Sequence, residues 1–148
     1  VEGADDALAL TALLQHHSER IRVALEQGAL LTHSLDGAAN LSYKASLLRD
    51  SLCDYYCFLD NDDAGRNSFE VARKNGLLTD ADCTFTICNG MAESEIEDLF
   101  EPDIYRTAIE TAHSVRLDVR MFRSRNKWSD RMRIAFQAQG RQWNDRIK

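Results

Sequence analysis

The chain has 148 residues, of which 44% are hydrophobic and 28% are charged, and its formal net charge is −6. These values are typical of one ordinary globular domain with its own core. They exclude a membrane span, because no apolar run approaches the roughly 18 residues that such a helix needs, and no signal peptide is visible. Because the chain starts at Val1 rather than Met, we expect it to be a piece of a longer protein.

Helical and strand-like segments alternate from the start of the chain. Residues 4–27 place leucines at mostly helical spacing, and Gly28 closes this predicted helix. The apolar run at 29–32 predicts a short buried strand. A turn at 37–40 precedes a second helix at 41–52, so this part of the chain is predicted as helix, strand and helix.

The alternation continues beyond residue 52. The aromatic-rich run YYCFL at 55–59 is typical of a buried parallel strand, and a loop and a helix follow it. Strands that alternate with helices predict an α/β domain with a central, mostly parallel sheet flanked by helices. Val1–Glu2 is then the stub of a truncated first strand. The remaining elements are a helix at 64–74, a strand at 84–88, helices at 94–100 and 104–115, and helix with loops across 116–148.

The cysteines show no metal-binding spacing. Cys53, Cys57, Cys83 and Cys88 lie in or beside apolar segments, and none form a C-x-x-C pair. This pattern disfavours a zinc site and predicts buried free thiols. Because free thiols persist in a reducing compartment, we expect a cytoplasmic protein.

Charge is unevenly spread along the chain. Residues 116–148 hold ten Lys or Arg residues against three Asp or Glu, a balance of +7, and residues 1–115 carry −13. An acidic body with a basic end is compatible with a polyanion such as DNA held by that end. The alternative is that the basic end is simply a solvated helical face.

Acidic residues gather behind three predicted strands. In open α/β sheets, functional groups collect at the carboxyl ends of the strands. Asp60 and Asp62 follow the strand at 55–59, and alternate residues of an extended segment point to the same side, so both carboxylates can converge on one cation. The three groups are Glu2 with Asp5 and Asp6, then Asp60 with Asp62, and finally Glu93, Glu95, Glu97 and Asp98.

So many carboxylates at one sheet edge would repel one another unless a cation compensates. Two unit charges about 4 Å apart cost roughly 1 kcal/mol in water and roughly 4 kcal/mol at an effective dielectric near 20. Mg²⁺ and Mn²⁺ prefer oxygen ligands of this type. Two such ions can activate a water and stabilise the leaving oxygen in phosphodiester cleavage. Taken singly, each acidic group also fits a helix start, a turn or a solvated face, and their joint placement favours the metal site.

The sequence does not match other known metal-binding or nucleotide-binding motifs. An EF-hand loop that starts at Asp60 would need an acid or amide at its fifth position and Glu at its twelfth, where Ala64 and Val71 stand. An aspartyl phosphatase would want Thr or Val where Ala64 stands. The chain has no P-loop sequence, so it is not itself an ATPase of that class.

Glu2 together with Asp60 and Asp62 resembles the pattern of a Toprim domain. That Rossmann-like family is marked by a Glu at the end of its first strand and a D-x-D pair at the end of a later one. Gly37 also matches a glycine turn after the second strand, where the family often has two glycines and this chain has Asp36 first.

Two further segments resemble one Toprim subfamily. The spacing Glu2-x-x-x-Asp6 and the acidic segment ESEIEDLF at 93–100 are similar to motifs of the OLD (overcoming lysogenization defect) nucleases. Those proteins carry a lysine beyond the third acidic motif, and Lys127 is the better candidate of the two lysines in the basic end, the other being Lys148. The resemblance covers about residues 1–135.

The resemblance implies a DNA endonuclease or nickase that uses two Mg²⁺ or Mn²⁺ ions. Glu2 and Lys127 would then be catalytic, with Lys127 placing a positive charge near the scissile phosphate. The implied metal ligands are Glu2, Asp6, Asp60, Asp62 and one of Glu95 and Glu97, and the implied DNA contacts are Arg120, Arg123, Arg125, Arg131 and Arg133. If the segment is extended, Glu95 and Glu97 share a face. If it is helical, only one of them can point inward.

The resemblance also implies partners and leaves rivals open. The parent protein would join an ATPase domain to this one, act against phage in the cytoplasm and form a homo-oligomer through the parent, with no membrane partner. One rival is a Toprim domain of a topoisomerase or primase, which would need a catalytic tyrosine or a zinc-binding region. The other is a Toprim-like module that binds metal or protein and does not cut.

Overall fold

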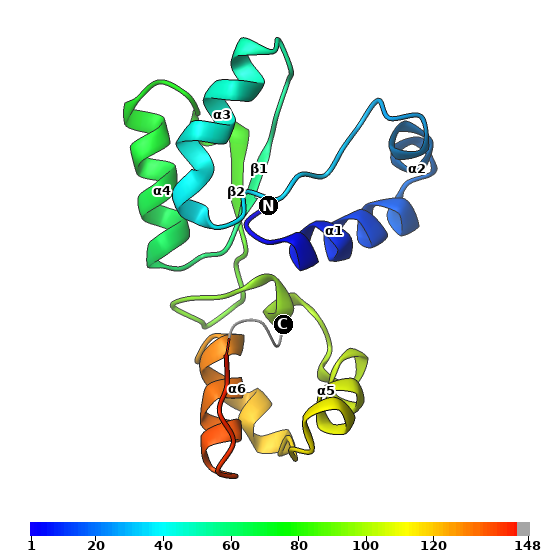
Figure 1. The fold of residues 1–148 in the computed structure, drawn as a ribbon, viewed down its shortest axis with the longest axis vertical. Helices are drawn as coiled ribbons and strands as arrows, with labels where there is room; N and C mark the ends of the chain where they lie inside the picture. Colours follow the sequence, from blue (N-terminus) through cyan, green and yellow to red (C-terminus); the bar gives the residue numbers. More distant parts are fainter. Residues whose placement is uncertain (145–148) are drawn as a thin grey trace. The chain divides into compact units, whose positions relative to one another are not determined.

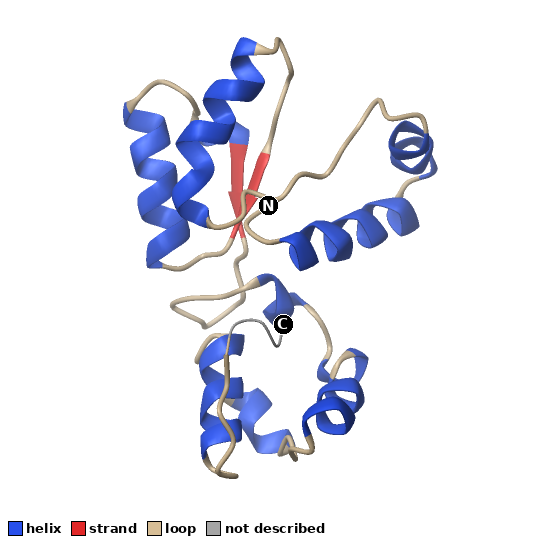
Figure 2. Cartoon of the chain, in the orientation of Figure 1, coloured by secondary structure: helices blue, strands red, loops and turns tan. Residues whose placement is uncertain are grey.

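The structure of the protein, a computed structural model, describes residues 1–144. These residues form six α-helices and a two-stranded parallel sheet (Figures 1 and 2), so the α/β class predicted from the sequence is confirmed. They fall into two compact units: unit 1 consists of Val1–Leu59 and Asp63–Phe85, and unit 2 of Asp60–Asp62 and Thr86–Lys148. A single domain over 1–148 stays a prediction, and residues 145–148, with Lys148, lie outside the described part.

Unit 1 begins with two short helices in place of the one predicted over 4–27. Helix α1 spans Ala4–His17 and α2 spans Glu19–Glu26. Ser18 separates them, because its backbone is extended and its hydroxyl accepts a hydrogen bond from the N–H of Ile21 at 3.3 Å. A serine in this position caps the start of a new helix rather than continuing the old one.

The parallel sheet of unit 1 is shorter than predicted. Strand β1 covers Cys57–Leu59 and β2 covers Cys83–Phe85, with Cys57 opposite Cys83 and Leu59 opposite Phe85. The connection from β1 to β2 includes α4, Asp63–Lys74, and the 3-10 helix η2, Asp80–Asp82. Parallel strands require a crossover of this kind.

The strand predicted at 29–32 is wrong. These residues are mostly exposed, with Leu31 at 76%, and no strand forms there. Val1 and Glu2 are not assigned to a strand either. They run beside the segment at 33–37: the ammonium of Val1 donates to the carbonyl of His33, and the N–H groups of Leu35 and Gly37 donate to the carbonyls of Val1 and Glu2. Val1 therefore bonds to both neighbours of Ser34, as a residue of a parallel pair does.

Helices α3 and α4 pack together in unit 1 and help to enclose its core (Figure 1). Helix α3, Leu41–Asp50, follows the 3-10 helix η1 at Ala38–Asn40, and these helices agree with the predictions at 41–52 and 64–74. The buried core of this unit comprises Leu35, Leu41, Cys57, Leu59, Phe69, Ala72 and Leu78.

The cysteines differ in exposure, which corrects the prediction that all are buried. Cys53 is exposed and Cys57 is buried. Burial raises the pKa of the Cys83 thiol from 9.0 to about 12. Because the thiolate is the reactive form, this rise in pKa keeps the Cys83 thiol protonated and unreactive at neutral pH.

We therefore expect iodoacetamide to label Cys53 of the native protein first and to leave Cys57 and Cys83 largely unmodified. Peptide mass spectrometry after a short exposure at pH 7.5 measures this order. The urea-unfolded protein is the control, in which all the cysteines should react alike. Early labelling of Cys83 in the native protein would contradict the described burial.

Unit 2 holds short helices around an aromatic core. Its 3-10 helices are η3 (Ile96–Leu99), η4 (Pro102–Ile104) and η5 (Val119–Arg123), and its α-helices are α5 (Arg106–His113) and α6 (Trp128–Gln137). The α-helix predicted at 94–100 is thus only a 3-10 turn. The buried core comprises Val115, Leu117, Trp128, Met132 and Phe136. Across residues 1–144, no helix is both long and apolar enough to cross a membrane.

Candidate functional site

The D-x-D segment of unit 2 is held against the third acidic motif. Asn61, between Asp60 and Asp62, pairs with Ser94 in an antiparallel bridge, with N–H···O distances of 2.9 and 3.1 Å. The buried Ser94 hydroxyl donates to the carbonyl of Thr86 at 2.7 Å. This bridge brings the segment at 60–62 beside the segment at 93–98, two regions that are separate in the sequence.

Asp60 and Asp62 both accept hydrogen bonds within unit 2. Asp60 is buried, and its Oδ1 accepts a hydrogen bond from the backbone N–H of Ile96 at 3.0 Å. Asp62 accepts from the side chain of Lys127. Convergence of both carboxylates on one cation therefore stays a prediction.

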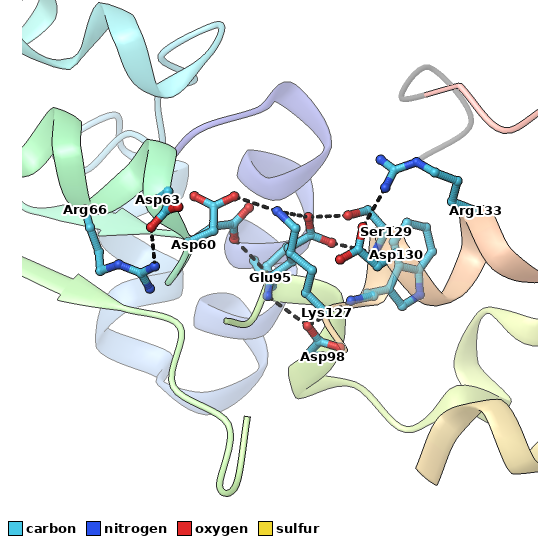
Figure 3. Close-up of polar contacts among 12 residues, drawn as sticks. Asp60, Asp63, Arg66, Glu95, Asp98, Lys127, Ser129, Asp130 and Arg133 are labelled. Carbon is cyan, nitrogen blue, oxygen red and sulfur yellow. Dashed lines mark hydrogen bonds and ion pairs between the residues drawn. The ribbon is translucent and has the colours of Figure 1, made fainter. Parts of the chain in front are cut away.

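Lys127 lies between two carboxylates from different segments. Its Nζ is 2.8 Å from Oδ2 of Asp62 and 3.4 Å from Oε1 of Glu95. The three side chains are 18%, 15% and 5% exposed, respectively. Lys127 and Glu95 can be followed in Figure 3. The oxygens of Asp62 and Glu95 thus share one cation, here an ammonium group.

Burial and ion pairing act in opposite directions on Lys127. Burial by itself would lower the pKa of the ammonium, whereas the hydrogen bond to Asp62 and the charges of Glu95 and Asp62 raise it. The net effect is a pKa above the ordinary lysine value. A raised lysine pKa stabilises the fold at all pH values below the ordinary one, and this stabilisation disappears only as the pH rises through the folded-state pKa. Lys127 is therefore charged at neutral pH.

Glu95 is bound at the start of helix α6. Its Oε2 accepts from the backbone N–H of Ser129 and its Oε1 from the hydroxyl of Ser129, both at 2.7 Å. Glu95 and Ser129 are 4% and 5% exposed. The first N–H groups of a helix have no partner within the helix and favour a carboxylate, so Glu95 satisfies one of them.

Asp98 attaches the same segment to α6 through a second carboxylate. Its Oδ2 accepts from the N–H of Glu95 at 2.9 Å and from the N–H of Trp128 at 3.1 Å. Its Oδ1 pairs with the guanidinium of Arg131. The 3-10 turn η3 and the first turn of α6 are thereby joined in one polar network (Figure 3).

Glu95 and Glu97, the alternative metal ligands of the third acidic motif, differ in backbone conformation. Glu95 is extended, with φ −113° and ψ 167°, and stands just before the turn η3. Its side chain reaches Lys127 and Ser129. Glu97 lies inside the turn and is half-buried. Glu95 therefore lies beside Lys127, and the choice of Glu95 or Glu97 as a metal ligand stays a prediction.

Glu2 and Asp6 belong to unit 1. Asp6 is 8% exposed and its Oδ2 accepts from the N–H of Gly3 at 2.7 Å, at the start of α1. This is the helix-capping role that was the alternative to a metal ligand. Glu2 is half-buried. Their roles as ligands, and the catalytic role of Glu2, stay predictions.

Arg131 differs from the other arginines predicted to contact DNA. It is 7% exposed, its guanidinium pairs with Asp98, and it also donates to the carbonyl of Phe122. The Arg131 guanidinium is buried and paired inside unit 2, so it is not available to bind a phosphate. The prediction that Arg131 contacts DNA is therefore withdrawn. Arg120, Arg123, Arg125 and Arg133 are exposed.

Asp62 and Glu95, which both face Lys127, are the residues that would hold the predicted divalent cation. Within residues 1–144, no set of three or more His, Cys, Asp and Glu side chains is arranged to hold a metal ion. Mg²⁺, however, is usually bound by one or two carboxylates and keeps several waters. Asp62 and Glu95 already face a common cation, so the donor chemistry suits such an ion.

The sequence did not single out Ser129, and it placed Asp98 only among the acidic residues. Ser129 binds a carboxylate 34 positions earlier in the chain, and Arg131 binds one 33 positions earlier. The only local signal is a serine near the start of a helix, which is common.

Comparison of the chain with protein-family models, curated proteins and solved structures finds no match.

Proposed function

We propose that this protein is a Mg²⁺- or Mn²⁺-dependent nuclease domain that hydrolyses phosphodiester bonds in DNA. The observation that carries the proposal is the shared cation position of Asp62 and Glu95, occupied by the ammonium of Lys127 at 2.8 and 3.4 Å. Two acidic groups and a lysine at one place are the residue types that metal-assisted phosphoryl chemistry needs.

In this proposal, Asp62 and Glu95 hold a divalent ion, and Asp60 lies two residues from Asp62 as a further acidic group. A divalent ion would supply a Lewis acid and a water of lowered pKa. Lys127 contributes a positive charge next to the substrate phosphate. The roles of Glu2, Asp6 and Glu97 as metal ligands rest on the sequence resemblance alone.

The resemblance to Toprim nucleases of the OLD type gains support from one turn in unit 1. Asp36 has φ +59° and Gly37 has φ +108°. These are the positions where that family often has two glycines, and positive φ favours glycine, with Asp among the residues that tolerate the left-handed region. The parallel pairing of β1 and β2 also accords with this family.

DNA is the proposed substrate because the exposed arginines are concentrated in the basic end of the chain. Arg120, Arg123, Arg125 and Arg133 are exposed in a segment with a balance of +7. Phosphate contacts made by such residues give sequence-independent, salt-dependent binding. By the same resemblance, we place the domain in a cytoplasmic, homo-oligomeric anti-phage protein with an ATPase domain.

Cleavage of supercoiled plasmid in the presence of Mn²⁺ tests the proposal. We expect nicking or linearisation that needs the metal, stops on addition of EDTA and is lost in Asp62→Asn. The matched control is Asp103→Asn, which makes the same chemical change at an exposed residue of unit 2 and should retain cleavage.

Each alternative function gives a different result in this assay. Binding of Mn²⁺ without any cleavage by a folded protein would favour a module that binds metal and does not cut. Relaxation of the plasmid without permanent nicks would favour a topoisomerase-type Toprim domain. Cleavage that survives in Asp62→Asn would refute the proposed site.

A further inference from the structure

Ser129 is the residue of unit 2 whose contacts with the proposed site have no counterpart in the sequence motifs. It donates two hydrogen bonds to one carboxylate, from its N–H to Oε2 and from its hydroxyl to Oε1 of Glu95, both at 2.7 Å. A single hydrogen bond would leave the carboxylate group of Glu95 free to rotate about the axis of that hydrogen bond. Two bonds, one to each oxygen, define the plane of the group.

The hydroxyl of Ser129 binds the oxygen that faces the cation position. Oε1 of Glu95 accepts from this hydroxyl and lies 3.4 Å from Nζ of Lys127. An ionised carboxylate has about four lone-pair sites. The bonds from Ser129 use two of these, so Glu95 keeps capacity for a metal ion or a metal-bound water.

Ser129 lies at the start of α6, beside a buried and closely packed tryptophan. It is the second residue of α6, and its neighbour Trp128 is 2% exposed. The Trp128 ring packs edge-on against Tyr105 and Trp143, with centroids 5.9 and 5.3 Å away. The aromatic core therefore fixes the start of α6, and the start of α6 fixes the two donors that Glu95 accepts.

We propose that Ser129 is a positioning residue that orients Glu95 and thereby sets the affinity of the Asp62–Glu95 pair for a divalent cation. This inference rests on the proposed function and adds to it a residue that orients one of the proposed metal ligands. Groups that hydrogen-bond to metal ligands change metal affinity by about 10–100-fold when they are removed. Because Ser129 donates to Glu95 rather than to the metal, its effect passes through that carboxylate.

Titration calorimetry with Mn²⁺ alone, on the 148-residue protein, tests this role. We expect Ser129→Ala to weaken Mn²⁺ binding about 10-fold or more, while Ser129→Thr, which keeps the hydroxyl, binds like the unaltered protein. Ser124→Ala is the matched control, because Ser124 also uses its hydroxyl in one local hydrogen bond, with the N–H of Asn126. Its Mn²⁺ affinity should not change.

A double-mutant cycle separates positioning from a general loss of stability. In the background of Glu95→Gln, Ser129→Ala should cause little further loss of Mn²⁺ affinity, because residues that act through one group are not additive. Thermal unfolding and circular dichroism of each variant show whether α6 is retained.

Three results would overturn the inference. Equal Mn²⁺ affinity of Ser129→Ala and the unaltered protein would show that the hydroxyl does not orient the ligand. Additive losses in the cycle would show that Ser129 acts independently of Glu95. Absence of Mn²⁺ binding by the unaltered protein would overturn the proposed function and this inference together, whereas the first two results leave the proposed function intact.

Discussion

Lys127→Met is expected to bind Mn²⁺ at least about tenfold more tightly than the unaltered protein, a change of about 1.4 kcal/mol. The reason is the ammonium that lies 2.8 Å from Asp62 and 3.4 Å from Glu95. A divalent and a monovalent cation about 4 Å apart repel by roughly 8 kcal/mol at an effective dielectric of 20. When the metal ion binds, the flexible lysine side chain can move away, which removes most of this repulsion. The Lys127→Met substitution removes the positive charge altogether while it keeps an unbranched side chain.

The same variant is expected to lose DNA cleavage by about 100-fold, because a positioned positive charge at a reacting oxygen is worth that much. Calorimetry with Mn²⁺ and plasmid nicking on the same preparation measure the two effects. Lys74→Met, an exposed residue of α4, is the matched control and should leave both unchanged. Weaker Mn²⁺ binding in Lys127→Met would show that the lysine organises the carboxylates instead of competing with the metal.

Asp98→Asn is expected to destabilise the protein by about 3–5 kcal/mol, the usual cost of removing one partner of a buried ion pair. The side chains of Asp98 and Arg131 are 1% and 8% exposed. Asparagine keeps the shape of the aspartate but leaves the guanidinium without its counter-charge. It also weakens the bonds that Glu95 and Trp128 donate to Asp98.

Urea unfolding followed by tryptophan fluorescence measures this change, because Trp128 lies in the same network. The exposed Asp103→Asn serves again as the control and should unfold like the unaltered protein. A loss below about 1 kcal/mol would match a solvent-exposed pair, and would contradict the burial described for Asp98 and Arg131.

Hydrophobic periodicity predicted the helices with strong apolar faces. The predictions at 41–52 and 64–74 correspond to α3 and α4, which bury Leu41 and Phe69. The same approach failed at 29–32, because an apolar run forms a strand only where neighbouring strands and a core cover it. In the structure Leu31 is exposed and has no strand partner among the described residues.

Tertiary contacts overrode local propensity in the third acidic motif. The segment at 94–100 was predicted as a helix, but Glu95 is extended and only a 3-10 turn follows. Asp98 accepts from the N–H groups of Glu95 and Trp128. A carboxylate shared between two chain segments favours a short turn over a longer helix, and no local pattern of residues indicates such sharing.

Residue types and their local spacing were sufficient to predict the α/β class and to single out the acidic pair Asp60 and Asp62, and the resemblance to OLD nucleases singled out Lys127. They could not show that Lys127 pairs with Asp62, 65 positions away, or that Ser129 holds Glu95. Spacing along the chain determines which side chains share a face of one element. Which elements then meet, and which carboxylate receives which donor, depends on the packing of Trp128 in the core of unit 2 and on the hydrogen bonds between the start of α6 and the segment at 93–98.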